Sequence, residues 1–204
     1  MLRRLLQLYI GLVLYGVSTA LFVHANLGAD PWDVFHLGVA KQLGISFGTV
    51  IILTGAAVLL LWIPIRQMPG LGTVSNVIVL GLAADATLAV LPPLESMVAR
   101  SALLAGAIVL NAIATGMYIG AGFGPGPRDG LMTGLHARTG WSLRGIRTAI
   151  ELTVLVIGWL LGGKFGVGTV IYALSIGPLI QLCLPWFSQP VSRNAVSPPR
   201  EIVS

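Results

Sequence analysis

Charge is what this sequence has least of. Asp, Glu, Lys and Arg make up 9% of its 204 residues, whereas a soluble domain has about 25%. Hydrophobic residues make up 55% of the chain. So few charged side chains do not fit the surface of a water-soluble fold. The composition therefore excludes a sizeable soluble module and indicates one polytopic, all-α membrane domain over residues 1–187.

Cysteine pairs and catalytic motifs are also lacking. Cys183 is the only cysteine, which excludes a disulfide within the chain. His24, His36 and His136 have no metal-ligand spacing with each other or with the cysteine. No nucleophile–base motif, phosphate-binding loop or dinucleotide fingerprint occurs. We therefore expect no enzyme activity, no catalytic residue, no cofactor and no metal site.

Six segments have the length and apolar content to cross a bilayer, which takes about 20 residues. One of them carries Asp85, and the weakest carries Arg147 and Glu151 in its first two turns. The predicted spans are residues 5–23, 47–65, 71–91, 101–119, 145–162 and 167–187.

Two further segments, residues 31–43 and 127–138, are too short and too charged to be spans. Each begins with proline, a favourable first residue of a helix, and follows a turn that contains glycine. A helix of this length rises only about 18 Å. We predict that both are half-helices, either re-entrant or lying at the membrane interface.

The basic residues predict the orientation. With the N-terminus in the cytoplasm and six spans, nine basic residues lie inside and three outside, in agreement with the positive-inside rule. Both termini are then cytoplasmic, and residues 188–204, rich in Ser and Pro, are expected to form a disordered cytoplasmic tail. The inside set is Arg3, Arg4, Arg66, Arg128, Arg138, Arg144, Arg147, Arg193 and Arg200, and the outside set is Lys41, Arg100 and Lys164.

The chain contains an internal repeat, with residues 5–91 matching residues 101–187. Each copy has three spans, an odd number, so the second copy must enter the membrane from the opposite side. The two copies are therefore predicted to be inverted. Sliding the sequence by 96 residues aligns Gly28, Pro31, Asp33 and Gly72 with Gly124, Pro127, Asp129 and Gly168. We expect these glycines and prolines to form structural turns, with Gly72 and Gly168 in tight turns between adjacent spans.

Inverted repeats with broken helices are a recurring design of secondary transporters, in which the binding site lies where the repeats meet. Helix N-termini present free N–H groups and a partial positive charge. Two half-helices that aim their N-termini at one central region would favour an anion or a dipolar solute. In the alternative, Asp33 and Asp129 are only helix caps. The two interpretations are compatible.

The candidate substrate-binding residues are the charged side chains in these segments. Arg147 and Glu151 are four residues apart on one helix face, either as a site or as a structural pair. Asp85 has no basic neighbour in sequence and is expected in a water-filled vestibule or in proton coupling. Arg128 is expected either to pair with Asp129 or Glu151 as a structural arginine or to attract anions near the cytoplasmic mouth of a pathway. The full set is Asp33, Asp85, Arg128, Asp129, Arg147 and Glu151.

Five stretches together carry a family resemblance: LGADPWDVFHLG, GLGTVSN, GPGPRDGLMTGL, RTAIELTVLVIGWLLGG and GVGTVIYALSIGP. With them the chain resembles the YczE/YyaS/YitT family of bacterial membrane proteins and is most similar to its YczE branch. The resemblance runs from the first span to about Pro185. It implies a small integral protein of the bacterial plasma membrane, and it implies no substrate or activity.

Two classes of function remain open at this stage. The inverted repeat and the half-helices favour a secondary transporter or channel for a small solute. The small size and the sparse intramembrane charge fit a non-transporting accessory protein that acts through a membrane partner. In either case the partners expected are the lipid bilayer and a small solute, a further copy of the chain or another membrane protein. The net charge of +5 is explained by contact with anionic lipid headgroups and does not indicate nucleic acid binding.

Overall fold

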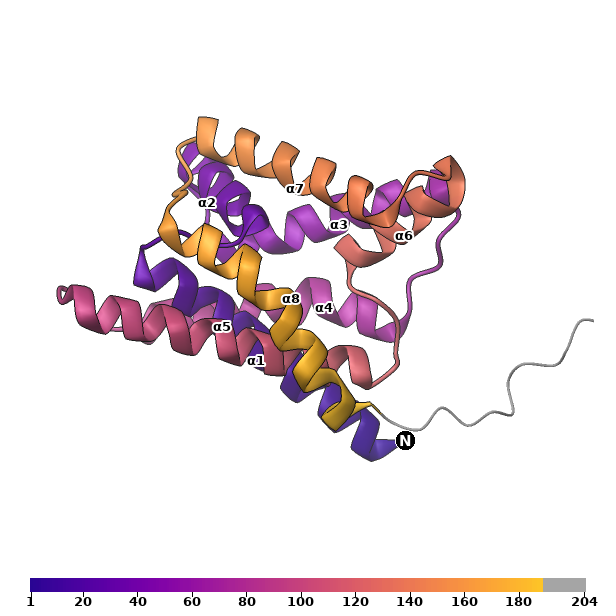
Figure 1. Cartoon of the computed structure of the whole chain (residues 1–204), viewed down its shortest axis with the longest axis horizontal. Coiled ribbons are helices and arrows are strands. Elements are labelled where there is room, and N and C mark those ends of the chain that lie inside the picture. Colours follow the sequence, from indigo (N-terminus) through magenta and orange to yellow (C-terminus); the bar gives the residue numbers. More distant parts are fainter. Residues whose placement is uncertain (189–204) are drawn as a thin grey trace, which may run out of the picture.

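A computed structural model of the chain describes residues 1–188, so the predicted tail at 189–204 lies outside the described residues. The described part contains eight α-helices and no β-strand (Figure 1). The helices are α1 (Leu2–Ala25), α2 (Pro31–Leu43), α3 (Phe47–Ile65), α4 (Leu71–Val90), α5 (Met97–Gly120), α6 (Pro127–Thr139), α7 (Leu143–Leu160) and α8 (Val167–Phe187). The predicted helices, including both short ones, are therefore confirmed as helices.

The ends of the short helices α2 and α6 follow from local sequence. Pro31 and Pro127 occupy the first turn, where the missing N–H costs no hydrogen bond. Asp30 caps α2 by accepting a hydrogen bond from the backbone N–H of Asp33. Both helices end at a glycine in the left-handed conformation, Gly44 and Gly140.

Five helices, not six, have the length and apolar content to span a membrane: α1, α3, α4, α5 and α8. The exception, α7, has 18 residues and includes Arg144, Arg147 and Glu151. Three charged side chains in so short a helix lower its apolar content too far. The prediction of six spans is thus confirmed for five of them.

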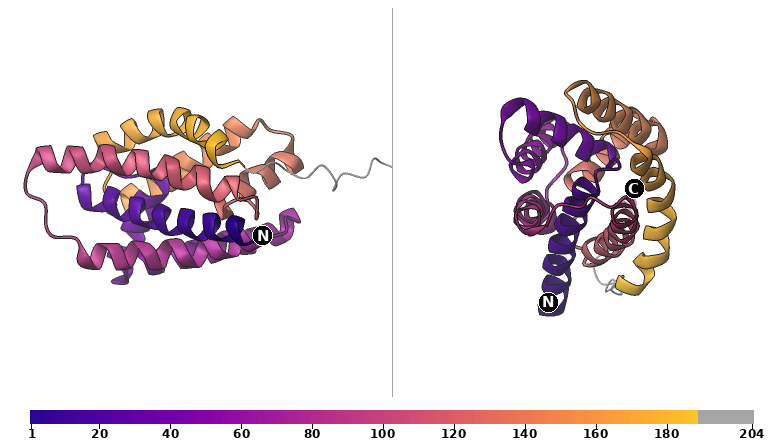
Figure 2. Two further views of the ribbon diagram at one scale, coloured as in Figure 1. Left: turned by 90° about the horizontal axis from the view of Figure 1, so that it is seen from below. Right: turned by 90° about the vertical axis from the view of Figure 1, so that its left-hand side faces the viewer.

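The helices form two layers (Figure 1). In one layer α1 packs against α4 and α5, and α5 packs against α8. In the other, α2 packs against α3 and α7, and α6 also contacts both α3 and α7. The helices α1 and α5 run antiparallel, because Arg4 Nε donates to the carbonyl of Ala121 and Arg100 Nε to that of Ala25, at 3.0 and 2.7 Å (Figure 2).

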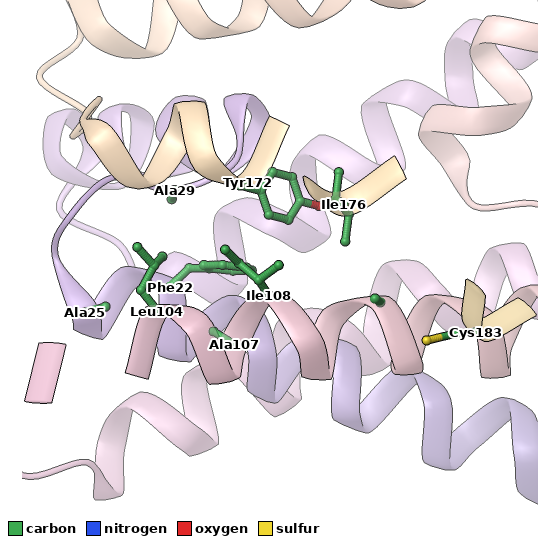
Figure 3. Close-up of a cluster of buried hydrophobic side chains, with 10 residues drawn as sticks. Phe22, Ala25, Ala29, Leu104, Ala107, Ile108, Tyr172, Ile176 and Cys183 are labelled. Carbon is green, nitrogen blue, oxygen red and sulfur yellow. The ribbon is translucent and has the colours of Figure 1, made fainter. Parts of the chain in front are cut away.

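Buried side chains of α1, α5 and α8 form the largest apolar cluster, which surrounds Phe22 and Tyr172 (Figure 3). The two rings meet edge to face with centroids 5.1 Å apart. Near them Asn111 links the helices, since it donates to Ser18 Oγ and accepts from Tyr172 Oη. This cluster gives one layer a rigid base.

The layers are joined on one side by close packing of α3 on α4. A Cβ atom at Gly81 would lie 2.5 Å from the carbonyl oxygen of Gly48, so only glycine permits this approach. On the other side, α7 and α8 make little contact with each other. A Cβ atom at Gly177, which is 96 residues after Gly81, would have no other atom within 4 Å. The two sides of the molecule therefore differ in how tightly the layers are closed.

The predicted tight turns at Gly72 and Gly168 are wrong in detail. Each glycine is the second residue of a helix, α4 or α8, rather than part of the preceding turn. Their N–H groups donate to the carbonyls of Phe123 and Leu27, at 2.9 and 2.8 Å. The first N–H groups of a helix have no partner within it, which explains why they bond to a neighbouring loop.

The loops that precede α2 and α6 do contain the predicted turns. Gly28 has a φ of 109° and Gly124 a φ of 113°, both in a backbone region that residues other than glycine rarely adopt. Each loop lies against the N-terminus of a helix from the other half of the chain. Gly28 contacts Gly166 and Thr169, and Gly124 contacts Gly70 and Thr73.

Candidate functional site

The N-termini of α2 and α6 meet at a buried ion pair. Arg128 Nη1 lies 3.2 Å from Asp30 Oδ2, and Nη2 lies 4.0 Å from Asp33 Oδ1. The side chains of Asp30 and Asp33 are only 8% and 2% exposed. The predicted convergence of the two half-helix N-termini is therefore found, with one cation held between two carboxylates.

Two tryptophans fix the position of α6. The guanidinium of Arg128 lies over the ring of Trp32, 4.9 Å from its centroid, which favours a cation–π contact. Trp62 of α3 donates from Nε1 to the carbonyl of Pro127, at 3.0 Å. Gly130, one turn into α6, leaves the room that the Trp62 ring occupies. These contacts hold Arg128 in the plane between the two layers.

The side chain of Asp33, in the first turn of α2, is almost completely buried. Its Oδ1 is 3.4 Å from Nδ1 of His36, which is also buried. Its Oδ2 has no hydrogen-bond partner among residues 1–188, and neither does the buried Nε1 of Trp32. Buried polar atoms normally have partners, so two such atoms in one short helix mark the site as specialised.

Asp129 differs from the other two carboxylates. It is exposed, and its Oδ2 accepts a hydrogen bond of 3.0 Å from the hydroxyl of Tyr118. Within residues 1–188 it takes part in no ion pair. The ring of Tyr118 lies edge-on to that of Tyr15, with centroids 5.9 Å apart. The carboxyl group of Asp129 thus lies at an aromatic pair and has no ion-pair partner within residues 1–188.

A cavity of about 260 Å³ lies at this meeting point, between the two layers. Its lining includes carboxylate, guanidinium and aromatic groups. Arg147 and Glu151 line it on the side of α7, where Arg147 Nε lies 2.8 Å from Glu151 Oε1. The predicted pair is therefore present, with side chains 56% and 30% exposed. The other charged and aromatic residues of the lining include Tyr15, Asp30, Trp32, Tyr118, Arg128, Asp129 and Tyr172.

The partner predicted for Arg128 was wrong. Arg128 pairs with Asp30 and Asp33, not with Asp129 or Glu151. Asp30 itself was missed, because the position 96 residues later is Gly126 and the repeat gives no match there. The available signal was the Asp-Pro pair, since aspartate before a helix-starting proline is a favoured N-cap.

Asp85 lies apart from this cavity, at the contact between α3 and α4. Its carboxylate accepts hydrogen bonds from Ser46 Oγ at 2.5 Å and from the backbone N–H of Gly48 at 2.6 Å. It therefore caps the N-terminus of α3 from the neighbouring helix α4. A carboxylate at this position also complements the helix dipole. The structure brings Asp33, Arg128, Asp129, Arg147 and Glu151 together, and it leaves Asp85 at the α3–α4 contact.

Fold and site together describe a small α-helical membrane protein whose ionisable residues gather between two helix layers. Residues 2–185 match the model of a family of unknown function, DUF6198, and the chain belongs to that family. It is 37% identical to an uncharacterized protein of Haemophilus influenzae over 177 residues, which cover 87% of this chain and 81% of the relative. No solved structure matches the chain.

Two relatives come from Bacillus subtilis. The uncharacterized membrane protein YczE is 31% identical over 179 residues, 87% of this chain and 83% of YczE. The uncharacterized protein YyaS is 23% identical over 180 residues, 86% of this chain and 90% of YyaS. The resemblance inferred from the motifs is thus confirmed, as is the greater similarity to YczE than to YyaS.

Proposed function

We propose that the protein is a secondary transporter of the bacterial plasma membrane that moves a small solute by alternating access. The observation that carries this proposal is the meeting of two short-helix N-termini, from different halves of the chain, at a cavity lined by charged and aromatic side chains. In transporters built from repeats, broken helices place their N-termini at such a central site. Backbone that is not helical at membrane depth needs a protein or aqueous environment, which the cavity provides.

The proposal includes two inverted repeats, α1–α4 and α5–α8, with α7 as the sixth span. Helices α5 to α8 each begin within one residue of the position 96 places after the start of α1 to α4. The antiparallel packing of α1 and α5 agrees with repeats of opposite orientation. The charges of α7 can be tolerated in a span because Arg147 and Glu151 face the cavity and neutralise each other.

The unequal closure of the two sides supports alternating access. The contact between α3 and α4 is tight, whereas the equivalent helices α7 and α8 make little contact. With the predicted orientation, α7 begins and α8 ends in the cytoplasm, so the described state is closed outside and more open inside. If α7 packed tightly on α8 while α3 separated from α4, the protein would be in the opposite state, open outside and closed inside.

Disulfide trapping tests this proposal without knowledge of the solute. A Cβ at Gly55 would lie 3.4 Å from Cβ of Val77, close to the 3.5–4.5 Å of a disulfide, so Gly55→Cys with Val77→Cys is expected to cross-link α3 to α4. The equivalent pair 96 residues later is Glu151→Cys with Ala173→Cys. Alternating access predicts that this second pair also cross-links, because the other state closes α7 on α8. The measurement is the disulfide yield in native membranes, with Cys183 replaced by alanine.

A rigid accessory protein gives a different result. It would cross-link at Gly55 and Val77 and leave the Glu151 and Ala173 pair reduced even after prolonged oxidation, and that outcome would favour the accessory function over transport. The control is Leu152→Cys with Leu174→Cys, on the same two helices. Both leucines are exposed, at 56% and 75%, and neither state should join them within one molecule.

The orientation is tested by cysteine labelling in intact cells. With Cys183 replaced, a cysteine at Glu95 is expected to react with a membrane-impermeant maleimide, and a cysteine at Ser204 is expected to react only after the cells are opened. The physical reason is the excess of basic residues at the ends assigned to the cytoplasm. Labelling of Ser204→Cys from outside would contradict both the orientation and the inverted repeat.

A further inference from the structure

One carboxylate at the central cavity forms no ion pair within residues 1–188, and this indicates what the site binds. Resting on the proposed function, we propose that the cavity takes a small monovalent organic cation, an amine or quaternary ammonium, with Asp129 as its counter-ion and the rings of Tyr118 and Tyr15 as its walls. The sequence pattern favoured an anion or a dipolar solute, and the contacts of Arg128 argue against the anion.

The carboxylates near Arg128 differ in whether they have a cationic partner. Asp30 and Asp33 hold its guanidinium, at 3.2 and 4.0 Å. On the side of α7, Arg147 and Glu151 pair with each other. Asp129 lines the same cavity and forms no ion pair within residues 1–188, so it is the carboxylate that a monovalent cation would neutralise.

Two further ionisable groups near the cavity supply no cation to Asp129. His36 is enclosed by the rings of Trp32, Phe35 and Phe47, and an imidazole in such surroundings favours its neutral form. The hydroxyl of Tyr172 donates to Asn111 and carries no charge.

An anion would find two of the positive groups at this site already engaged. The guanidinium of Arg128 is held between Asp30 and Asp33. The N-terminus of α2 is capped by the carboxylate of Asp30, which accepts from the N–H of Asp33 at 2.7 Å, whereas the N-terminus of α6 has no side-chain cap. To bind Arg128 or the N-terminus of α2, an anion would have to displace a carboxylate and leave it buried and unpaired, which is strongly unfavourable.

Asp129 is the carboxylate available to a ligand. Asp30 and Asp33 are nearly enclosed and paired with Arg128, whereas Asp129 is exposed, lines the cavity and forms no ion pair within residues 1–188. The Tyr118 hydroxyl bonds to only one of its oxygens. That bond orients the carboxylate and leaves Oδ1 for a further partner.

The surrounding rings suit an organic cation better than a metal ion. Tyr15 and Tyr118 line the cavity beside Asp129 and are in contact edge to face. An ammonium group is attracted to an aromatic face, and aromatic walls are the usual recognition mode for quaternary ammonium. The cavity, at about 260 Å³, is below the roughly 300–1,000 Å³ of sites for drug-sized ligands, so the solute is expected to be small.

The test measures binding to the purified full-length protein by isothermal titration calorimetry and by the shift of its melting temperature. The probes are choline and tetraethylammonium as chlorides, sodium acetate and glycerol. We expect at least one of the two cations to bind and to raise the melting temperature, and the acetate and glycerol to do neither. Asp129→Asn should weaken that cation's affinity at least about tenfold, whereas Glu95→Gln, the same kind of change in an exposed loop, should leave it unchanged.

Two further variants distinguish a counter-ion role of Asp129 from a purely structural role. Asp129→Glu keeps the charge and should retain measurable binding, and Tyr118→Phe keeps the ring, loses the hydroxyl and should bind more weakly than the unmodified protein. Binding of acetate in preference to both cations, or cation binding that Asp129→Asn does not weaken, would overturn the proposal.

If the cations bind as expected but the α7–α8 pair never cross-links, the transport proposal fails and the cation site stands. If that pair cross-links but no cation binds, the cation site fails and alternating access stands.

Discussion

Arg128→Gln is expected to destabilise the protein by about 3–5 kcal/mol, the range for removing one partner of a buried ion pair. Two nearly enclosed carboxylates, Asp30 and Asp33, would lose the cation that lies between them. Glutamine can donate a hydrogen bond to one of them but supplies no charge. The measurement is the melting temperature in detergent, followed by the loss of monodisperse protein on size-exclusion chromatography.

The matched control is Arg138→Gln in the same helix. Arg138 is exposed near the C-terminal end of α6, so this change is expected to cost no more than about 0.5 kcal/mol. A second test uses Asp30→Asn combined with Arg128→Gln. Because the double change removes both charges of the shorter contact, it should be less destabilising than the sum of the single changes. Equal melting temperatures for Arg128→Gln and Arg138→Gln would show that the ion pair contributes little.

Gly168→Ala is expected to destabilise the protein by about 1–3 kcal/mol, as overpacking of a well-packed contact usually does, and Gly168→Leu by more. A Cβ at this position would lie 2.7 Å from the carbonyl oxygen of Gly28, which is backbone and cannot rotate away. The loop before α2 would have to move off the N-terminus of α8. That movement would stretch the hydrogen bond from the N–H of Gly168 to the carbonyl of Leu27. Thermal melting and expression level are the measurements.

The same helix provides the control. A Cβ at Gly177 would meet no atom of another segment within 4 Å, but Pro178 follows it and disfavours helical backbone at a residue with a Cβ, so Gly177→Ala is expected to change the stability little. Gly72→Ala should lie between the two, because its Cβ would be 3.1 Å from the carbonyl oxygen of Phe123. If Gly168→Ala melts at the same temperature as Gly177→Ala, the contact between loop and helix is looser than the structure indicates.

Most helix positions could be predicted from the sequence because their signals are local. Proline at the start and glycine at the end placed α2 at residues 31–43, as observed. The apolar run of 47–65 likewise coincides with α3. Gly72 and Gly168 were assigned to turns because a glycine-rich sequence does not distinguish a turn from a helix start that presses against another loop.

The site was only partly predictable, since its partners lie far apart in sequence. The repeat indicated that the N-termini of the two half-helices would converge on one central region, because the half-helices occupy equivalent places in the two copies. It could not indicate the pairing of Arg128 with Asp30, which has no equivalent in the second repeat. Tyr15 and Tyr118 lie in apolar spans, where a tyrosine facing a cavity has the same sequence pattern as one facing lipid or a neighbouring helix.

The crossed hydrogen bonds of Gly72 and Gly168 have a consequence for how the chain is made. The carbonyl of Leu27, ahead of α2, is bonded by the first turn of α8, the last of the described helices to leave the ribosome. The carbonyl of Phe123, ahead of α6, is bonded by α4, which is already in place when that loop is synthesised. The loop before α6 can therefore form its hydrogen bond to α4 as soon as it is synthesised. The loop before α2 can form its hydrogen bond to α8 only after nearly the whole polypeptide has been made. The first half of the chain is therefore synthesised well before the loop ahead of α2 acquires its final partner.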